Sequence, residues 1–172
     1  SASATASVTV SQVASSIVLS DTVPTFASLT DTTQLTATVK DANANVISGA
    51  TVTWATSDTT IATVSDAGLV TSVANGTATI TATSGSASAT ASVTVAQAAA
   101  TLSLSDSALT FASLTDKTQL TATVTDANGA TIPSPSITWA TSNDAVATVS
   151  STGLVTSVAD GSATITATSG EA

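Results

Sequence analysis

The side chains best suited to chemistry in this sequence are the oxygen donors of Asp41, Asn43 and Asn45. Their alternate spacing matches the first half of a calcium-binding loop. Such a loop also needs a glycine at its sixth position and a bidentate glutamate at its twelfth, and the twelfth residue here is Val52. We therefore interpret the segment as a turn between strands, because Asp and Asn side chains cap turns in this way.

Other cofactors are not expected. The chain has no His and no Cys, which removes the common ligands of zinc, haem and iron–sulfur centres. Calcium bound at the junction between units through Asp21 or Asp106 is left as an open alternative, although no cluster of acids supports it.

Catalysis is not expected either. No His is present to activate one of the many Ser and Thr hydroxyls. The two lysines, Lys40 and Lys117, occupy positions where the other half of the chain has Thr125 and Thr32. The carboxylates are scattered through turns rather than paired. We predict that the protein is not an enzyme.

Charge and hydropathy narrow the range of partners. Two basic residues against eleven acidic ones give a net charge of -9, which excludes a phosphate-binding surface and hence nucleic acid as a partner. No apolar run approaches the roughly 20 residues of a membrane-spanning helix, so we expect no membrane insertion.

The strongest signal is an internal repeat of 85 residues. Phe26 recurs as Phe111 and Trp54 as Trp139. Residues 1–87 align on residues 86–172 with 59 identities and no gap. The chain is therefore a tandem array of two similar units.

Each unit has the pattern of β-strands. Apolar residues alternate with Thr, as in Ala78, Ile80 and Ala82, and β-branched Thr favours strands at the polar positions. Turn sequences such as Asn75-Gly76 separate the runs. The pattern predicts an all-β protein of two tandem Ig-like β-sandwiches with about seven strands each. Trp54 and Trp139 are the expected core residues. The expected strands of the first unit are 16–20, 34–39, 51–57, 61–65, 69–73, 77–83 and 88–95.

The phase of the repeat, that is, the places where its units begin and end in the chain, indicates how copies could join. The opening segment recurs verbatim as Ser86–Val95, the last strand of the first unit, and the second unit stops before its own copy. We divide the chain into residues 1–12 (the last strand of a preceding or neighbouring unit), 13–97 (repeat 1) and 98–172 (repeat 2, incomplete). The expected assembly strand consists of Ser1, Ala2, Ser3, Ala4, Thr5, Ala6, Ser7, Val8, Thr9 and Val10.

Two explanations of this phase remain. The sequence is a window of a longer array, or the first strand of each molecule completes the second unit of a neighbour. In both, the partner is another copy of the repeat, in the same or a neighbouring chain.

The motifs resemble a known family. QLTATVKDAN (34–43), VTWATSDTTIATVS (52–65), GLVTSVANGTATITATSG (68–85) and their copies are similar to the bacterial Ig-like domain, group 2, and the stretch Asp126–Ala130 resembles the related domains of intimin and invasin stalks. The resemblance implies an extracellular module, at a cell surface or secreted, that is arrayed in bacterial adhesins, surface-layer proteins, cell-wall enzymes or phage structural proteins. It brings no catalytic motif.

These observations lead to one expected function and one alternative. We expect a structural repeat of an extracellular bacterial filament, stalk or adhesin, assembled head to tail with residues 1–10 completing the sandwich of another unit. The alternative is a module that binds a surface glycan or other carbohydrate, or ice, through outward Thr arrays such as Thr79 and Thr81.

Overall fold

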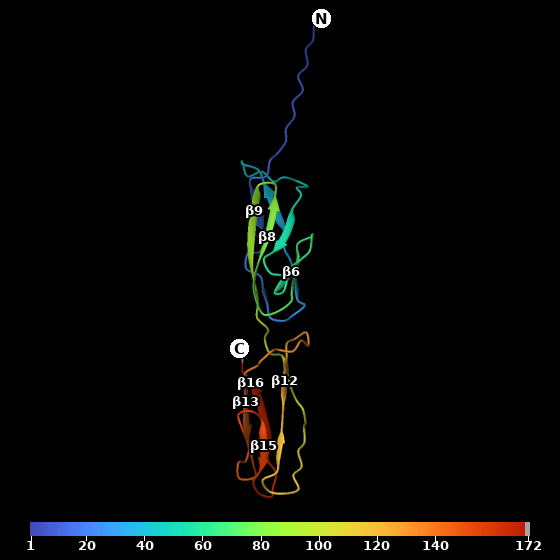
Figure 1. Ribbon diagram of the computed structural model, residues 1–172. Helices are drawn as coiled ribbons and strands as arrows, with labels where there is room; N and C mark the ends of the chain where they lie inside the picture. Colours follow the sequence, from blue (N-terminus) through green and yellow to red (C-terminus); the bar gives the residue numbers. More distant parts are fainter. Residues whose placement is uncertain (171–172) are drawn as a thin grey trace. The chain divides into compact units, whose positions relative to one another are not determined.

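The computed structural model describes residues 1–170, and all of their regular secondary structure is β-strand (Figure 1). Contacts divide the chain into two compact units. The first comprises Ser1–Phe26 and Thr30–Val95; the second comprises Ala27–Leu29 and Ala96–Ala172. Within the described residues, no helix could cross a membrane.

The first unit contains nine strands in three ladders. They are β1 (Ser16–Leu19), β2 (Thr25–Phe26), β3 (Thr32–Gln34), β4 (Ala37–Lys40), β5 (Thr53–Thr56), β6 (Ala62–Val64), β7 (Leu69–Ser72), β8 (Gly76–Ser84) and β9 (Ala87–Val95). The ladders have the orders β1-β4, β2-β9-β8-β5 and β3-β7-β6. Residues 1–13, which precede this sandwich, are exposed and carry no strand.

The β8–β9 hairpin forms as the alternation predicts. Ala78, Ile80 and Ala82 are buried, while the alternating residues Thr77 and Thr79 are exposed and Thr81 is half-buried. The two strands are antiparallel and pair from Gly76 opposite Val95 to Ser84 opposite Ala87. Successive side chains of a strand point to opposite faces, so this pattern places Thr outward and small apolar residues in the core.

One expected strand is divided in the structure. The range 34–39 was expected to be continuous, and this is wrong: β3 pairs with β7, whereas β4 pairs with β1. Between them the Leu35 N–H donates to the Gly68 carbonyl (2.9 Å), so the chain changes ladder at this point. The alternation of apolar and polar residues is not interrupted at this change, because Leu35, which lies between β3 and β4, is fully buried in the core.

One strand was missed. β2 is two residues long and runs parallel to β9, with Thr25 opposite Thr94 and Phe26 opposite Val95. A pair this short has no alternation to detect, and it exists only because β9 is beside it.

The described residues of the second unit form seven strands: β10 (Thr101–Leu104), β11 (Lys117–Gln119), β12 (Ala122–Thr125), β13 (Ile137–Thr141), β14 (Ala147–Val149), β15 (Leu154–Ser157) and β16 (Ile165–Ser169). They pair as β10-β12, β11-β15-β14 and β13-β16. Among the described residues of this unit there is no counterpart of β2 or β9. The prediction of two tandem Ig-like sandwiches, the second without its last strand, is confirmed.

The two tryptophans, expected in the cores, are half-buried. Each indole ring lies against a glycine on the turn before β7 or β15. A Cβ added to Gly68 would come within 2.9 Å of the Trp54 ring, and one added to Gly153 within 2.8 Å of the Trp139 ring. Both glycines have positive φ (+83° and +85°), a conformation that side chains disfavour.

Candidate strand-acceptor groove

Strand β9 is the central element of the first unit. It pairs with β8 along its whole length and with β2 near its C-terminal end. Its inward residues Ala87, Ala91, Val93 and Val95 are 4%, 0%, 0% and 2% exposed. Two further bonds continue the parallel pairing, from Ser92 N–H to the Thr22 carbonyl (2.8 Å) and from Thr94 N–H to the Pro24 carbonyl (3.0 Å).

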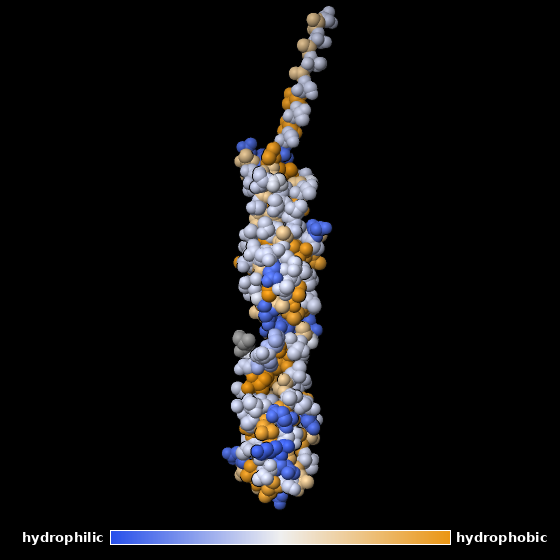
Figure 2. All heavy atoms as spheres, viewed as in Figure 1, coloured by the Kyte–Doolittle hydropathy of each residue, from blue (hydrophilic) through white to orange (hydrophobic). Residues whose placement is uncertain are grey.

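The second unit has a groove where β9 would lie. It has a volume of about 570 Å³, and its lining includes Asp106–Leu114 and Asp160–Ile165, the counterparts of the two segments that flank β9 in the first unit. Core residues such as Leu120 and Val155 form part of its floor. Hydrophobic residues reach the surface of this unit at several places in Figure 2.

Residues around the groove are less buried than their counterparts in the first unit. Phe26 is 6% exposed and Ile80 is 0% exposed, but their counterparts Phe111 and Ile165 are only half-buried. Residues 161–164 lie outside any strand, although the corresponding part of β8 is fully paired. The groove therefore exposes part of a sandwich core and one edge of β16.

The segment expected to act as a strand has the matching pattern. Ala2, Ala6, Val8 and Val10 lie at the positions of the four inward residues of β9. Val8 and Val10 are 85% and 86% exposed in this chain. Their counterparts Val93 and Val95 are 0% and 2% exposed, so the same two side chains are buried in one copy of the segment and exposed in the other.

Polar contacts gather around Asp126, which follows β12 and is 1% exposed. Its Oδ2 accepts hydrogen bonds from Gln97 Nε2 (2.9 Å) and from the Leu29 N–H (2.9 Å). Its Oδ1 accepts from the N–H groups of Asn128 (3.0 Å) and Ala130 (2.9 Å). Burial raises the pKa of this carboxyl, but the four donors outweigh burial and hold the pKa below its usual value.

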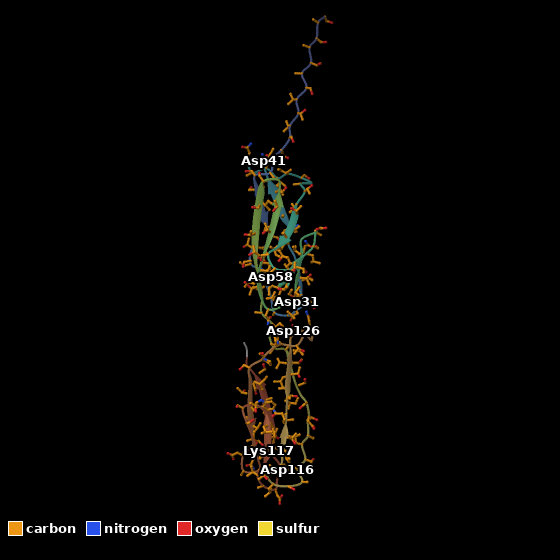
Figure 3. The ribbon with its side chains drawn as sticks, in the orientation of Figure 1. Asp31, Asp41, Asp58, Asp116, Lys117 and Asp126 are labelled. Atoms are coloured by element: carbon orange, nitrogen blue, oxygen red, sulfur yellow. The ribbon has the colours of Figure 1, made fainter. Side chains whose placement is uncertain are left out.

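Asp41 is the counterpart of Asp126 in the first unit. It accepts bonds from Gln12 Nε2 (3.1 Å) and from the N–H groups of Asn43 (3.0 Å) and Asn45 (2.9 Å). The Gln12 hydrogen bond is the main reason that the pKa of Asp41 is lowered. Figure 3 shows Asp41 at one end of the first unit and Asp126 at one end of the second, with Asp31 and Asp116 near the respective opposite ends.

These carboxylates act as turn caps in the structure. Asp21 accepts the Val23 N–H and Asp106 the Ala108 N–H, each at 2.9 Å. Among the described residues, no three acidic, His or Cys side chains lie together as a metal site would require. Sequence reasoning missed the Gln97–Asp126 contact, although both residues recur 85 positions apart as Gln12 and Asp41.

The comparison with family models identifies the chain. The model of the bacterial Ig-like domain (group 2) matches residues 4–95 and 101–172. The protein therefore belongs to this family, and the two matches fall on the two successive units of the repeat. The first match includes β9, and the second extends over the unit that has the groove.

The solved structures that the chain resembles include a surface-layer protein and two adhesins. Domains 5–6 of the surface-layer protein SbsC are 22% identical, with 91% of each chain covered and a TM-score of 0.45. The Yersinia pseudotuberculosis adhesin InvE is 21% identical, with 73% of this chain and 38% of that chain covered and a TM-score of 0.40. The Escherichia coli adhesin FdeC is 19% identical, with 91% and 55% covered and a TM-score of 0.38.

The chain spans 27% of the length of SbsC domains 1–6, another structure it resembles. Comparison with curated proteins gave no match.

Proposed function

We propose that the protein is a structural repeat of an extracellular filament, stalk or adhesin, and that its units join when Ser1–Val10 of one copy enters the groove of another. The observation that carries the proposal is the groove in the second unit, together with a segment identical in sequence to the strand that fills the same place in the first unit. Membership of the bacterial Ig-like family and the lack of catalytic residues support a structural, non-catalytic role at the cell surface.

The register of the joined strand follows from the first unit. Gly76 lies opposite Val95 and Thr79 opposite Ser92. Moving this pairing by one period sets Val10 opposite Gly161 and Ser7 opposite Thr164. Ala2, Ala6, Val8 and Val10 then face the core beside Ile165, and Ser1–Val10 runs parallel to Thr110–Phe111.

The energetics favour such a junction. Covering a valine side chain contributes roughly 2 kcal/mol, and two valines and several alanines are covered together. The backbone of β16 also gains a ladder partner, which removes an exposed sheet edge. Charge opposes the contact, since each chain carries -9, but the strand itself has no charged side chain.

The proposal is tested with two complementary chains. A donor chain carries SATASVTV, the sequence of Ser88–Val95, fused after Ala172, so that its own groove is filled while its residues 1–10 stay available. An acceptor chain lacks residues 1–10 and keeps an open groove. The proposal predicts that the two form a 1:1 dimer and that neither associates with itself, as measured by light scattering and calorimetry. Absence of the mixed dimer would overturn the proposal.

A second candidate function rests on the outward face of the β5-β8-β9 ladder. Thr77, Thr79 and Thr81 lie opposite Thr94, Ser92 and Thr90, which gives paired rows of hydroxyl and methyl groups. Such a face supports binding of a surface glycan or of ice. Thr79→Lys should then abolish binding on a glycan array or inhibition of ice recrystallisation, and a wild-type chain inactive in both assays would exclude this candidate.

A further inference from the structure

The loop Ala27–Leu29, which belongs to the second compact unit, has three polar contacts there. The Ala27 carbonyl accepts the Ala98 N–H (2.8 Å). The Leu29 N–H donates to Asp126 Oδ2 (2.9 Å), and the Leu29 carbonyl accepts from Asn128 Nδ2 (2.8 Å). Backbone groups of the loop are thus bound by a backbone N–H, a carboxylate and an amide.

The same loop occurs again as Ala112–Leu114, identical in sequence. Its backbone has the same shape at its end. Thr30 and Thr115, which follow the two loops, have φ of 64° and 66°, unusual for a β-branched residue. Their N–H groups donate to the Ser72 and Ser157 carbonyls, each at 3.0 Å. The two loops therefore end in the same backbone conformation and are anchored there by equivalent hydrogen bonds.

The residues that bind the loop are also repeated. Gln12, Asp41 and Asn43 match Gln97, Asp126 and Asn128 at a spacing of 85. Gln12 already donates to Asp41 Oδ2, as Gln97 does to Asp126 Oδ2. Burial differs at two of the three positions: Asp126 and Gln97 are buried, whereas Asp41 is half-buried and Gln12 is exposed. Asn43 and Asn128 are both exposed.

The second loop, Ala112–Leu114, is more exposed than the first loop. Leu114 is 56% exposed and Ser113 is exposed, whereas Ser28 is 4% exposed. The chain therefore has Asp41 and Asn43 without a bound loop, and the Ala112–Leu114 loop without residues that bind it. The contacts of Asp126 and Asn128 with Leu29 indicate how the two would fit together.

We propose that Asp41 and Asn43, together with the N–H of Val13, form a docking surface for the Ala112–Leu114 loop of a second copy of the chain. The inference rests on the proposed function, because a strand in the groove brings the two surfaces together. In the first unit, β9 ends at Val95 and Ala98 contacts the loop carbonyl three residues later. Val10 and Val13 have the same separation, so Ser1–Val10 in the groove sets Val13 beside Ala112 of the acceptor.

The contact gives the junction a polar specificity that the apolar strand lacks. The Leu114 N–H donates to Asp41 Oδ2, the Leu114 carbonyl accepts from Asn43 Nδ2, and the Ala112 carbonyl accepts from the Val13 N–H. A carboxylate that accepts backbone N–H bonds makes stronger contacts than a neutral acceptor. A partner whose loop has another shape would leave Asp41 and Asn43 without these bonds.

The test uses the donor and acceptor chains defined above, with substitutions in the donor. Asp41→Ala should raise the Kd of the mixed dimer about tenfold and Asn43→Ala about fivefold, in line with the usual contribution of one charged and one neutral hydrogen bond. The control Asp66→Ala removes an exposed turn carboxylate of the same unit and should change the Kd less than twofold. Thermal unfolding of each donor variant checks that its first unit remains folded.

A second readout is the exchange rate of the Leu114 amide in the acceptor. Its exchange should slow at least about tenfold in the dimer, and Asp41→Ala in the donor should reverse this protection. If the dimer forms but Asp41→Ala behaves as Asp66→Ala does and the Leu114 amide stays unprotected, the docking surface is refuted while strand exchange remains. If no dimer forms, the proposed function itself fails.

Discussion

Ile80 of β8 lies directly opposite Ala91 of β9, and both side chains are fully buried. The counterpart of Ile80 in the second unit, Ile165, is half-buried and faces the groove. The two positions have the same sequence neighbours on their own strand. The difference in burial therefore comes from the neighbouring strand, β9, which is present beside Ile80 and has no counterpart beside Ile165 among the described residues.

The inward valines of the assembly strand provide the first prediction. Val8→Asp in the donor chain places a carboxylate where Val93 is 0% exposed in the first unit. Burying an unpaired carboxylate costs several kcal/mol, so the mixed dimer should weaken at least about 100-fold. Ser7→Asp is the matched control, because the counterpart Ser92 is exposed. Calorimetry distinguishes the two; equal losses for both variants would contradict an inward Val8.

Ionic strength provides the second prediction. Each chain carries -9, so two chains repel at low salt, while the groove and the strand meet through apolar side chains. Raising the salt concentration from about 10 mM to about 150 mM shortens the screening length from roughly 30 Å to roughly 8 Å. Association of the donor and acceptor should become faster, as measured by stopped-flow light scattering. A decrease in rate with salt would indicate an attractive charge pairing instead.

The glycines that lie against the two tryptophan rings provide the third prediction. Gly153→Ala adds a Cβ within 2.5 Å of the Leu120 carbonyl and 2.8 Å of the Trp139 ring. Such overpacking at a positive φ should lower the free energy of unfolding of the second unit by about 2–4 kcal/mol. Chemical unfolding followed by Trp fluorescence measures the change.

Gly129→Ala is the control for that substitution. Gly129 also has positive φ (+81°), but a Cβ there meets nothing within 4 Å. The first unit already has Ala44 at this position, with φ of 63°. The control should cost no more than about 1 kcal/mol; a loss as large as that of Gly153→Ala would show that φ alone, and not the Trp contact, decides the effect.

The buried carboxylate provides the fourth prediction. Removing the buried Asp126 carboxylate removes its hydrogen bonds with the Gln97 amide and with the Leu29, Asn128 and Ala130 N–H groups. Loss of such bonds at a buried carboxylate costs roughly 1–3 kcal/mol, so Asp126→Ala should lower the thermal midpoint of the second unit by several degrees. Asp41→Ala should have a smaller effect on the first unit, because Asp41 is only half-buried.

The same carboxylate makes stability depend on pH. The pKa of Asp126 in the folded state lies below its unfolded value of 3.8. Its contribution is therefore complete above that value and is lost as the pH falls through the lower, folded-state pKa. Thermal midpoints of the wild type and Asp126→Asn should differ at neutral pH and approach each other as the pH falls below 3.8 and through the lower, folded-state pKa. A constant difference over this range would show that ionisation of Asp126 is not involved.

Much of the fold could be predicted from local pattern. The alternation of Ala78, Ile80 and Ala82 with Thr identifies β8 because each residue's face is set by its own strand. The period of 85 then transfers the assignment to the second unit. The identity of Ser1–Val10 with Ser86–Val95, which contains β9, could also be recognised, because the sequence is distinctive and its position in the period is fixed.

The rest depends on contacts between distant residues. The division between β3 and β4 is produced by Gly68, more than thirty residues away, and leaves no break in the alternation. β2 exists only as a parallel partner of β9. The set around Asp126 joins three separate segments, so the turn residues Asp126 and Asn128 gave no local sign of binding Leu29.

The most direct test of strand exchange is a disulfide set at the expected register. The chain has no Cys, so Ser7→Cys and Thr164→Cys introduce the only thiols, at positions whose counterparts Ser92 and Thr79 lie opposite each other. Opposite residues of an antiparallel pair have Cα atoms about 4.5–5.5 Å apart, within the range for a disulfide. Mild oxidation of the full-length double variant should give a ladder of covalent multimers on a non-reducing gel. The shifted pair Ser7→Cys with Thr168→Cys should give none; equal ladders from both pairs, or no ladder from the first, would contradict the proposed insertion of Ser1–Val10 into the groove.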